Sequence, residues 1–282
     1  MKKPTQFPEQ EQAQPGLQHK MVPKPELIRA NYKGSEKLSN KVALITGGDS
    51  GIGASVVLYF AKEGADIALV YLSETTDAKS IQKEVRKMKR KCLLIKKDLT
   101  KEKNCTAAIH ACIDEYGQLD IVVNNAAMQF PQNKLTDISK KQLLKTFETN
   151  IYPYFYIAIA ALKHLTKGST IINTSSVTAY RGSEHLVDYA STKGAIVSFT
   201  RSLAKQLAEK GIRVNGVAPG PIWTPLIPAS FEDVTDFGQD TPMGRAGQPS
   251  EVGPAYVYLA SEDSSYVTGQ FIHVNGGEII GG

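Results

Sequence analysis

The chain has few cysteines and no long hydrophobic run. Three of its 282 residues are cysteine, and no two of them form a Cys-x-x-Cys pair, which argues against a disulfide framework and against a zinc site. Buried free thiols are the expected state, and they fit a reducing cytosol. No apolar stretch approaches 18 residues, and the N-terminal MKKPTQFPEQEQ lacks the apolar core of a secretory signal. The sequence predicts a cytoplasmic protein that binds no metal and no membrane.

The charge balance is close to that of an ordinary globular protein. Charged residues make up 22% of the chain, and the formal net charge is +5. The densest basic stretch, 83–91, is interrupted by Glu84, Val85 and Met88, which indicates a solvated helix face rather than a binding patch. No motif combines basic and aromatic residues, so nucleic acid is not a predicted partner. The modest positive excess suits a small anionic ligand.

Residues 1–40 differ from the rest of the chain. They are rich in Pro, Gln, Lys and Glu and show no sustained period, so they cannot bury enough apolar surface to fold alone. We interpret them as an N-terminal extension that either stays mobile or lies extended along the body or a neighbouring subunit. Docking is slightly favoured over disorder. Five apolar residues are candidate anchors: Leu17, Met21, Val22, Leu27 and Ile28.

From residue 41 onward, short apolar runs alternate with longer amphipathic stretches. Seven runs have the continuous apolar character of strands buried on both faces: 42–46, 67–71, 92–95, 121–124, 170–174, 214–218 and 271–274. Six stretches are predicted helices: 51–63, 75–90, 101–116, 139–165, 188–209 and 249–260. This alternation predicts an α/β fold, a Rossmann-type doubly wound parallel sheet of about seven strands, with 41–282 as a single domain.

A glycine-rich turn joins the first predicted strand to the first predicted helix. It runs Thr46-Gly47-Gly48-Asp49-Ser50-Gly51-Ile52-Gly53. Glycines let the backbone turn sharply and let a pyrophosphate approach it closely. The free N–H groups and the positive dipole end of the helix N-terminus then favour the phosphates. The spacing is GxxxGxG rather than GxGxxG, so the turn has the glycines that the general dinucleotide fingerprint requires, but at different spacing.

This turn and several later motifs together resemble the short-chain dehydrogenase/reductase family. TGGDSGIG is similar to the family's TGxxxGIG loop, and Asn124-Asn125-Ala126-Ala127 is similar to its NNAG motif with alanine in the last position. Ser176 with the Tyr189-x-x-x-Lys193 pair, and the PGPIWT segment that begins at Pro219, follow in the family's order. The resemblance covers 41–282 and implies direct hydride transfer between NAD(P) and an alcohol or carbonyl group.

The same resemblance implies which residues bind the dinucleotide. The adenine is expected beside Asp98, the phosphates on the glycine-rich turn, and the nicotinamide beside the segment that begins at Pro219. The full set of cofactor contacts is Gly47, Asp49, Ser50, Gly51, Ile52, Tyr71, Leu72, Ser73, Asp98, Leu99, Asn125, Ala126, Ala127, Tyr189, Lys193, Pro219, Gly220, Ile222 and Thr224.

Tyr189 and Lys193 lie four residues apart in a predicted helix, so their side chains face the same way. A free phenol has a pKa of about 10, and a neighbouring ammonium favours its ionised form. Tyr189 is therefore a candidate general acid and base. Ser176 ends the fifth predicted strand, at the edge of the sheet where ligands gather, and its hydroxyl could stabilise a developing alkoxide. Its neighbour Ser175 is a rival that the family spacing disfavours.

Asn150 lies within a predicted helix, where asparagine is unfavourable and calls for a reason. By resemblance it distorts the helix and binds a water linked to Lys193, which adds it to the catalytic set. An interior asparagine bonded to backbone is a compatible alternative. Gln129 and His185 are expected at the mouth of the pocket, with His185 more plausible as a surface residue than as a second catalyst.

The end of the second predicted strand bears on the choice between NADP and NAD. An acidic residue there would bind the ribose 2′-OH and repel a 2′-phosphate. Tyr71 stands where NAD-specific relatives carry Asp, and Leu72 stands where many NADP-preferring relatives carry Arg. Ser73 could bond a 2′-phosphate, whereas Glu74 could reach a 2′-OH. These residues slightly favour NADP over NAD and leave the use of both open.

The substrate and the assembly are expected from resemblance alone. Residues 224–247 would form the family's mobile lid, and the Pro/Gln-rich extension is similar to that of a bacterial subgroup described as stress-associated, glucose/ribitol-dehydrogenase-like or aldehyde-reducing. A small sugar, polyol or aldehyde is the expected substrate. The predicted helices at 139–165 and 188–209, with the last strand, would form the interfaces of a homotetramer. The alternative function is a catalytically silent, dinucleotide-binding regulatory protein, against which the complete catalytic set argues.

Overall fold

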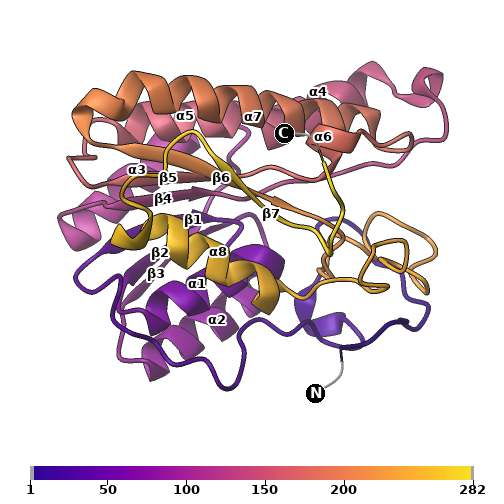
Figure 1. Cartoon of the computed structure of the whole chain (residues 1–282), viewed down its shortest axis with the longest axis horizontal. Helices are drawn as coiled ribbons and strands as arrows, with labels where there is room; N and C mark the ends of the chain where they lie inside the picture. Colours follow the sequence, from indigo (N-terminus) through magenta and orange to yellow (C-terminus); the bar gives the residue numbers. More distant parts are fainter. Residues whose placement is uncertain (1–2, 281–282) are drawn as a thin grey trace.

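The computed structural model describes residues 3–280, which are built around a parallel sheet between two layers of helices (Figure 1). The strand order is β3-β2-β1-β4-β5-β6-β7. The strands are Val42–Thr46 (β1), Asp66–Tyr71 (β2), Cys92–Lys96 (β3), Ile121–Asn124 (β4), Thr170–Thr174 (β5), Arg213–Pro219 (β6) and Phe271–Val274 (β7). All seven predicted strands are present, and the predicted α/β class is confirmed.

The helices follow the predicted order, with short additions. The α-helices are Gly51–Lys62 (α1), Thr75–Lys87 (α2), Glu102–Tyr116 (α3), Lys140–Asn150 (α4), Tyr152–Ala161 (α5), Thr178–Arg181 (α6), Val187–Leu207 (α7) and Pro249–Ala260 (α8). The 3-10 turns are Gln18–Lys20 (η1), Leu135–Asp137 (η2), Ala208–Lys210 (η3) and Glu262–Ser264 (η4). Helices α1, α2 and α8 cover one face of the sheet, and α3, α5 and α7 cover the other (Figure 1).

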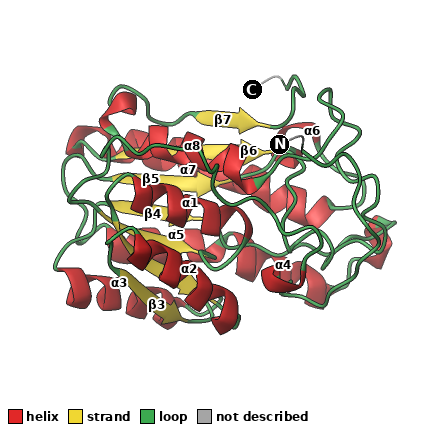
Figure 2. Cartoon of the chain, turned by 90° about the horizontal axis from the view of Figure 1, so that it is seen from below, coloured by secondary structure: helices red, strands yellow, loops and turns green. Residues whose placement is uncertain are grey.

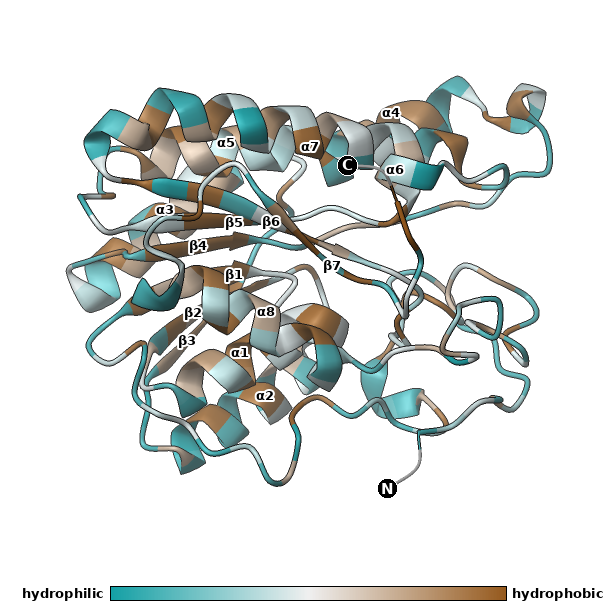
Figure 3. Ribbon diagram, viewed as in Figure 1, coloured by the Kyte–Doolittle hydropathy of each residue, from teal (hydrophilic) through white to brown (hydrophobic). Residues whose placement is uncertain are grey.

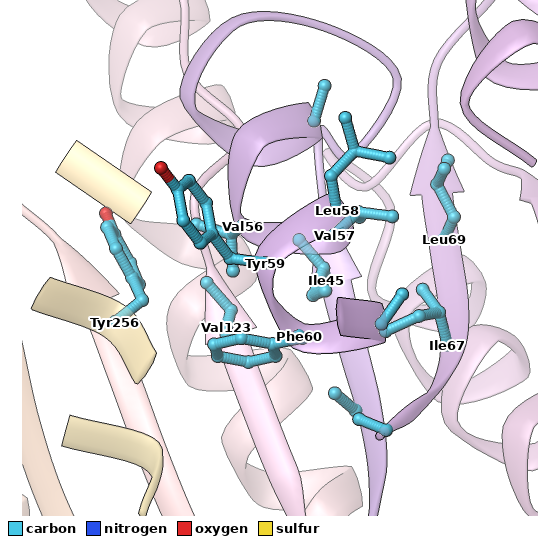
Figure 4. Close-up of a cluster of buried hydrophobic side chains, with 14 of the residues drawn as sticks. Ile45, Val56, Val57, Leu58, Tyr59, Phe60, Ile67, Leu69, Val123 and Tyr256 are labelled. Carbon is cyan, nitrogen blue, oxygen red and sulfur yellow. The ribbon is translucent and has the colours of Figure 1, made fainter. Parts of the chain in front are cut away.

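Burial on both faces explains why the strands are continuously apolar. In β1, Ala43 and Ile45 face the cluster under α1 and α8, whereas Val42 and Leu44 face the cluster under α3 and α5. Alternate side chains therefore enter two different cores, which favours apolar residues on both faces. The buried polar side chain of Asn173 in β5 is hydrogen-bonded. Figure 3 shows the apolar strands in the middle of the fold. We call the cluster under α1 and α8 the first core, and Figure 4 shows it around the aromatic side chains of α1.

The predicted helix at 139–165 is wrong as a single element. The chain breaks at Ile151, whose φ of −128° and ψ of −41° separate α4 from α5. Pro153 lies in the first turn of α5, where its missing N–H is tolerated, although it could not have continued the ladder of α4. The break places Asn150 at the very end of α4.

All seven carboxyl ends of the strands open on one edge of the sheet, because the strands are parallel. Figure 2 shows the long loops gathered beyond the arrowheads at this edge. The strand order reverses between β1 and β4, the position where ligands bind in open α/β sheets. Here the Thr46 hydroxyl accepts hydrogen bonds from the N–H groups of Asn125 (2.8 Å) and Ala126 (3.1 Å). The two central loops are thus fixed against each other.

The described part of the N-terminal segment, 3–40, lies along the body. Phe7 stacks on Trp223 with ring centroids 3.7 Å apart, in a third apolar cluster that is separate from the two faces of the sheet. Met21 is buried as expected, and Leu17, Leu27 and Ile28 are half-buried. Val22 is 60% exposed, so its proposed role as an anchor is wrong. Phe7 and Leu38 are buried anchors that the sequence did not indicate.

Candidate active site

A cavity of about 540 Å³ lies at the carboxyl ends of the strands, within the size range of small-molecule sites. It is lined by the loops that follow β1 to β6 and by part of α7. Every site residue predicted from the sequence lines this cavity except Asn150, which is fully buried. Gln129 and His185 line it as well. The structure therefore brings together residues that lie as far apart in the sequence as Gly47 and Thr224.

The glycine-rich turn has a backbone that other residues could not form. Gly47 and Gly51 have φ of 63° and 53°, in the left-handed region that favours glycine. A Cβ on Gly53 would lie 1.9 Å from the Gly47 carbonyl oxygen. The turn therefore brings bare backbone and the N-terminus of α1 to the cavity wall, which fits the pyrophosphate of a dinucleotide.

The second dinucleotide motif also fits. Ala127, which replaces the glycine of the family motif, does not have a positive φ, so its methyl group causes no backbone strain. The Asn125 side chain donates to the carbonyl oxygens of Thr46 (3.1 Å) and Gly47 (3.3 Å), which ties this motif to the glycine-rich turn. Both loops are held in place by the protein's own hydrogen bonds.

Tyr189 and Lys193 are buried side by side on α7. The Lys193 Nζ lies 5.3 Å from the centroid of the Tyr189 ring, and it donates to the Thr174 carbonyl oxygen at the end of β5 (3.0 Å). The side chain of Lys193 is 1% exposed. The helix spacing thus delivers both groups to the cavity wall, and β5 fixes the position of the ammonium.

Burial shifts the pKa of both groups so that the neutral form of each is favoured. It raises the pKa of Tyr189 to about 12, against a smaller lowering by the Ser176 hydroxyl. It lowers the pKa of Lys193 to about 7. In the chain by itself desolvation therefore outweighs the attraction between ammonium and phenolate that the spacing of the two residues predicts. Tyr189 carries its proton at neutral pH.

The two candidate serines have different surroundings. The Ser175 hydroxyl donates to the Lys193 carbonyl oxygen (2.9 Å), inside the contact between β5 and α7. The Ser176 Oγ accepts from the N–H and the hydroxyl of Thr178 (3.2 and 3.0 Å). Because Ser176 accepts both of these bonds, its own proton stays available to a ligand in the cavity.

Asn150 bonds to the loop that follows β4. Its side chain accepts from the Met128 N–H and donates to the Met128 carbonyl oxygen, both at 2.8 Å, and its amide also lies 3.3 Å from the Thr192 hydroxyl. Asn150 is therefore an interior asparagine bonded to backbone, as the alternative interpretation expected. The side chain also joins α4, the β4 loop and α7 directly behind the cavity.

At the end of β2, Leu72 and Ser73 both line the cavity and are both exposed. The Leu72 side chain is 43% exposed, whereas Tyr71 is buried in the first core with its hydroxyl 3.3 Å from that of Thr75. Ser73 donates to Glu74 (2.8 Å). Since Tyr71 packs in the core, Leu72 and Ser73 are the side chains best exposed to a group on the adenosine ribose.

Sequence reasoning missed three contributors to the site. Asp188 accepts hydrogen bonds from Thr146 (2.7 Å) and Gln142 (3.1 Å) on α4, and so fixes the turn of α7 that carries Tyr189. Its place directly before Tyr189 was the available signal. Residues 14–16 of the extension line the cavity, and segment 224–247 is held by that extension through the Phe7 and Gln12 backbones. The position of residues 14–16 on the cavity wall and the bonds between the extension and segment 224–247 both join distant parts of the chain, so the sequence alone carried no signal for them.

A metal site is not formed by the part of the chain that the structure describes. Within residues 3–280 no three His, Cys, Asp or Glu side chains stand close enough together to hold an ion. The three cysteines are buried and unpaired. No helix in the same range is long and apolar enough to cross a membrane.

Comparison with known proteins agrees with this geometry. Residues 47–278 match a family model described as enoyl-(acyl carrier protein) reductase. The chain is 51% identical over 286 residues to the glucose and ribitol dehydrogenase of Daucus carota, with 98% of each chain covered. It is 49% identical over 281 residues to NADPH-dependent aldehyde reductase 1, chloroplastic, of Arabidopsis thaliana, covering 96% of this chain and 98% of that protein.

A solved structure shows the same architecture. A short-chain dehydrogenase from Burkholderia cenocepacia J2315 in complex with NADP superposes with a TM-score of 0.81 at 28% identity, covering 86% of this chain and 98% of that one. The sequence matches extend over almost the whole length of the relatives, so they concern the complete fold and not one motif. The chain belongs to the short-chain dehydrogenase/reductase family of NAD(P)-dependent oxidoreductases.

Proposed function

We propose that the chain interconverts an alcohol and a carbonyl group on a small sugar, polyol or aldehyde, with NADP preferred over NAD. The observation that carries the proposal is the buried pair of Tyr189 and Lys193 on the wall of the cavity. The names of two relatives, a glucose and ribitol dehydrogenase and an NADPH-dependent aldehyde reductase, support the substrate class and the cofactor.

The side chains divide the work on the substrate oxygen. In carbonyl reduction the Tyr189 hydroxyl donates its proton to that oxygen, and in alcohol oxidation the phenolate takes it back. The Ser176 hydroxyl donates a hydrogen bond to the same oxygen and stabilises the charge that develops on it. Lys193, fixed by the Thr174 carbonyl, stabilises the phenolate when its own amine is protonated. When bound, the dinucleotide supplies or accepts the hydride at the substrate carbon.

Asn150 is a positioning residue in this scheme. By holding both backbone polar groups of Met128, it fixes the loop that carries Asn125 to Ala127 along the cavity. It also lies at the break between α4 and α5, where the backbone is not part of a continuous helix. The family resemblance assigns to it, in addition, a link in the proton relay that ends at Lys193.

NADP is preferred because the three residues Tyr71, Leu72 and Ser73 at the end of β2 carry no charge that would repel its extra phosphate. The nearby carboxylate of Glu74 also lines the cavity and bonds to Ser73. Leu72 and Ser73 are neutral, and the buried Tyr71 stands in the place of a repelling aspartate. The Ser73 hydroxyl can turn from Glu74 to a phosphate oxygen. No arginine is present in these positions to attract the phosphate, so NAD remains a usable cofactor.

The assembly is proposed to be a homotetramer in the cytoplasm. Three side chains of α5, Tyr152, Phe155 and Ile159, are exposed on one face of the helix. Two leucines of α4, Leu143 and Leu144, are exposed as well. Apolar side chains gathered in this way favour an interface. The three buried free cysteines favour a reducing compartment.

The test is a panel of sugars, polyols and aldehydes with each nicotinamide, read at the absorbance of the reduced cofactor. We expect turnover with at least one substrate, and a loss of about 10²-fold to 10⁴-fold in kcat for Tyr189→Phe, because only the proton-transferring oxygen is removed. Tyr266→Phe, at a fully exposed tyrosine, is the matched control. Near-normal rates for Tyr189→Phe would contradict the proton-transfer role, and cofactor binding without any turnover would favour the regulatory alternative.

A further inference from the structure

The N-terminal extension is built into the cavity and does not merely lie near it. At one side of η1 the buried Asp77 of α2 accepts from the backbone N–H groups of Gln18 (2.8 Å) and His19 (3.2 Å) and from the His19 ring. The Gln18 side chain in turn accepts from the N–H of Gly51, at the start of α1 (2.8 Å). The extension is therefore fastened to the same helix end that faces the cavity.

The turn that precedes η1 forms part of the cavity wall. Gln14, Pro15 and Gly16 all line it. A Cβ on Gly16 would lie 2.1 Å from the Pro225 carbonyl oxygen, so this backbone packs tightly on the start of segment 224–247. Two walls of the cavity, the extension and that segment, thus meet at Gly16.

Gln14 places a fixed hydrogen-bond acceptor in this wall. Its Nε2 donates to the Gln129 carbonyl oxygen. Because a carbonyl oxygen can only accept, this bond decides which end of the amide is which. The remaining atom, Oε1, is buried and has no partner among the described residues. A desolvated acceptor without a donor is unfavourable, and a ligand hydroxyl would satisfy it.

The position of Gln129 relates this acceptor to the reacting centre. Gln129 directly follows Met128, whose N–H and carbonyl are both bonded to Asn150. Gln14 is therefore joined through one loop to the residues that surround Tyr189. The reacting oxygen of the substrate belongs at Tyr189 and Ser176, so a substrate hydroxyl that bonds to Gln14 would be a second one, on another carbon of the same molecule.

We infer that the N-terminal extension completes the substrate pocket and that Gln14 is a specificity-determining residue, which accepts a hydrogen bond from a non-reacting hydroxyl of a polyhydroxylated substrate. This inference rests on the proposed function and narrows it. It selects hydroxyaldehydes, sugars and polyols over simple alkyl aldehydes and alcohols. The recognition comes from a segment outside the sheet and its helices.

The experiment compares two three-carbon aldehydes, glyceraldehyde and propanal, in the full chain with NADPH. The wild-type chain is expected to favour glyceraldehyde in kcat/KM. Gln14→Ala should lower the ratio of the two kcat/KM values about tenfold, as expected for one neutral hydrogen bond, mainly through the KM for glyceraldehyde. Affinity for NADPH and the melting temperature should stay unchanged. Gln6→Ala, at an exposed glutamine of the same extension outside the cavity, should leave the ratio as it is.

The outcomes separate this inference from the proposed function. If the wild-type chain turns over no alcohol or carbonyl compound at all, the proposed function fails and the inference fails with it. If it reduces aldehydes but Gln14→Ala has the wild-type ratio, the inference alone is overturned. Should Gln14→Ala not fold, Gln14→Asn, which keeps the amide but shortens its reach, must lower the ratio in the same direction, and an unchanged ratio there overturns the inference too.

Discussion

Burial acts on Tyr189 and Lys193 in opposite senses, and the result suits proton donation. With its pKa raised to about 12, the Tyr189 hydroxyl keeps its proton at neutral pH and is ready to donate it to a carbonyl oxygen. With its pKa lowered to about 7, Lys193 is charged below that pH and neutral above it. In the chain by itself the positive charge that favours the phenolate is therefore lost as the pH rises through about 7. The sequence spacing predicted the pair, but the size of the desolvation depended on the packing around it.

Leu72 is the position where the cofactor preference can be changed without disturbing the core. An arginine there would be placed to pair with a 2′-phosphate, so Leu72→Arg should raise the preference for NADPH over NADH about tenfold in kcat/KM. Tyr71→Asp is a poorer test, because Tyr71 is packed in the first core and its replacement would damage the fold. Leu135→Arg, at another exposed leucine outside the cavity, is the control. An unchanged preference in Leu72→Arg would remove this position from cofactor selection.

Asp49 links the glycine-rich turn to the pH dependence of stability. Burial raises its pKa from 3.8 to about 7, and the nearby Asp77 and Glu74 add to the effect. Between these two values the unfolded chain has released the proton while the folded chain keeps it, so stability falls as the pH rises from about 4 to about 7. Asp49→Asn removes that loss. Its melting temperature should exceed that of the wild type by several degrees at pH 8 and by progressively less towards pH 4.

The control for this pH series is Asp137→Asn, at an exposed aspartate in η2. It should follow the wild-type melting temperature at every pH, because no buried carboxylate is removed. A constant difference between Asp49→Asn and the wild type from pH 4 to pH 8 would mean that Asp49 does not titrate in this range.

At the level of elements, one aromatic stack joins the first described residues of the extension to the start of segment 224–247. Phe7 and Trp223 lie 3.7 Å apart and almost parallel, at 9°, in a cluster that contains Met21, Ile227 and Val234. Phe7→Ala removes the larger part of this contact, at a cost of about 3 kcal/mol. Since the cluster is small and separate from the sheet, the part of the extension before η1 should detach locally, which exposes it to protease and raises the KM for substrate. The contacts of Gln18, His19 and Leu38 should hold the rest of the extension in place. Val22→Ala, at an exposed side chain, should change neither the cleavage nor the KM, and an equal cleavage rate in both variants would contradict this account.

The same elements show how far sequence reasoning reaches. The strands were predictable because burial on both faces requires an unbroken apolar run, which is a local property. The break at Ile151 was also present in the sequence, since Pro153 cannot continue a helix, but the surrounding helix-forming residues outweighed it. The docking of Phe7 on Trp223 was not predictable, because it joins residues more than two hundred positions apart. The same distinction applies to the site. Its motifs are made of residues close together in the sequence and were predictable, whereas the wall formed by Gln14 depends on a contact between distant residues and was not.

Across the part of the molecule that the structure describes, the sheet, its helices and the extension leave an apolar surface uncovered. It lies on α5, where the ring centroid of Phe155 is 4.5 Å from that of Phe199 on α7 and Ile159 is 60% exposed. Ile159→Lys places a charge in the proposed interface, where it would lose its hydration without gaining a partner. We expect the wild-type chain to have the mass of a tetramer by light scattering, and the variant to dissociate to a smaller species at the same concentration. Tyr266→Lys, on a fully exposed side chain, should keep the wild-type mass. If Ile159→Lys also keeps it, this face of α5 does not join subunits, and a wild-type monomer would contradict the tetramer itself.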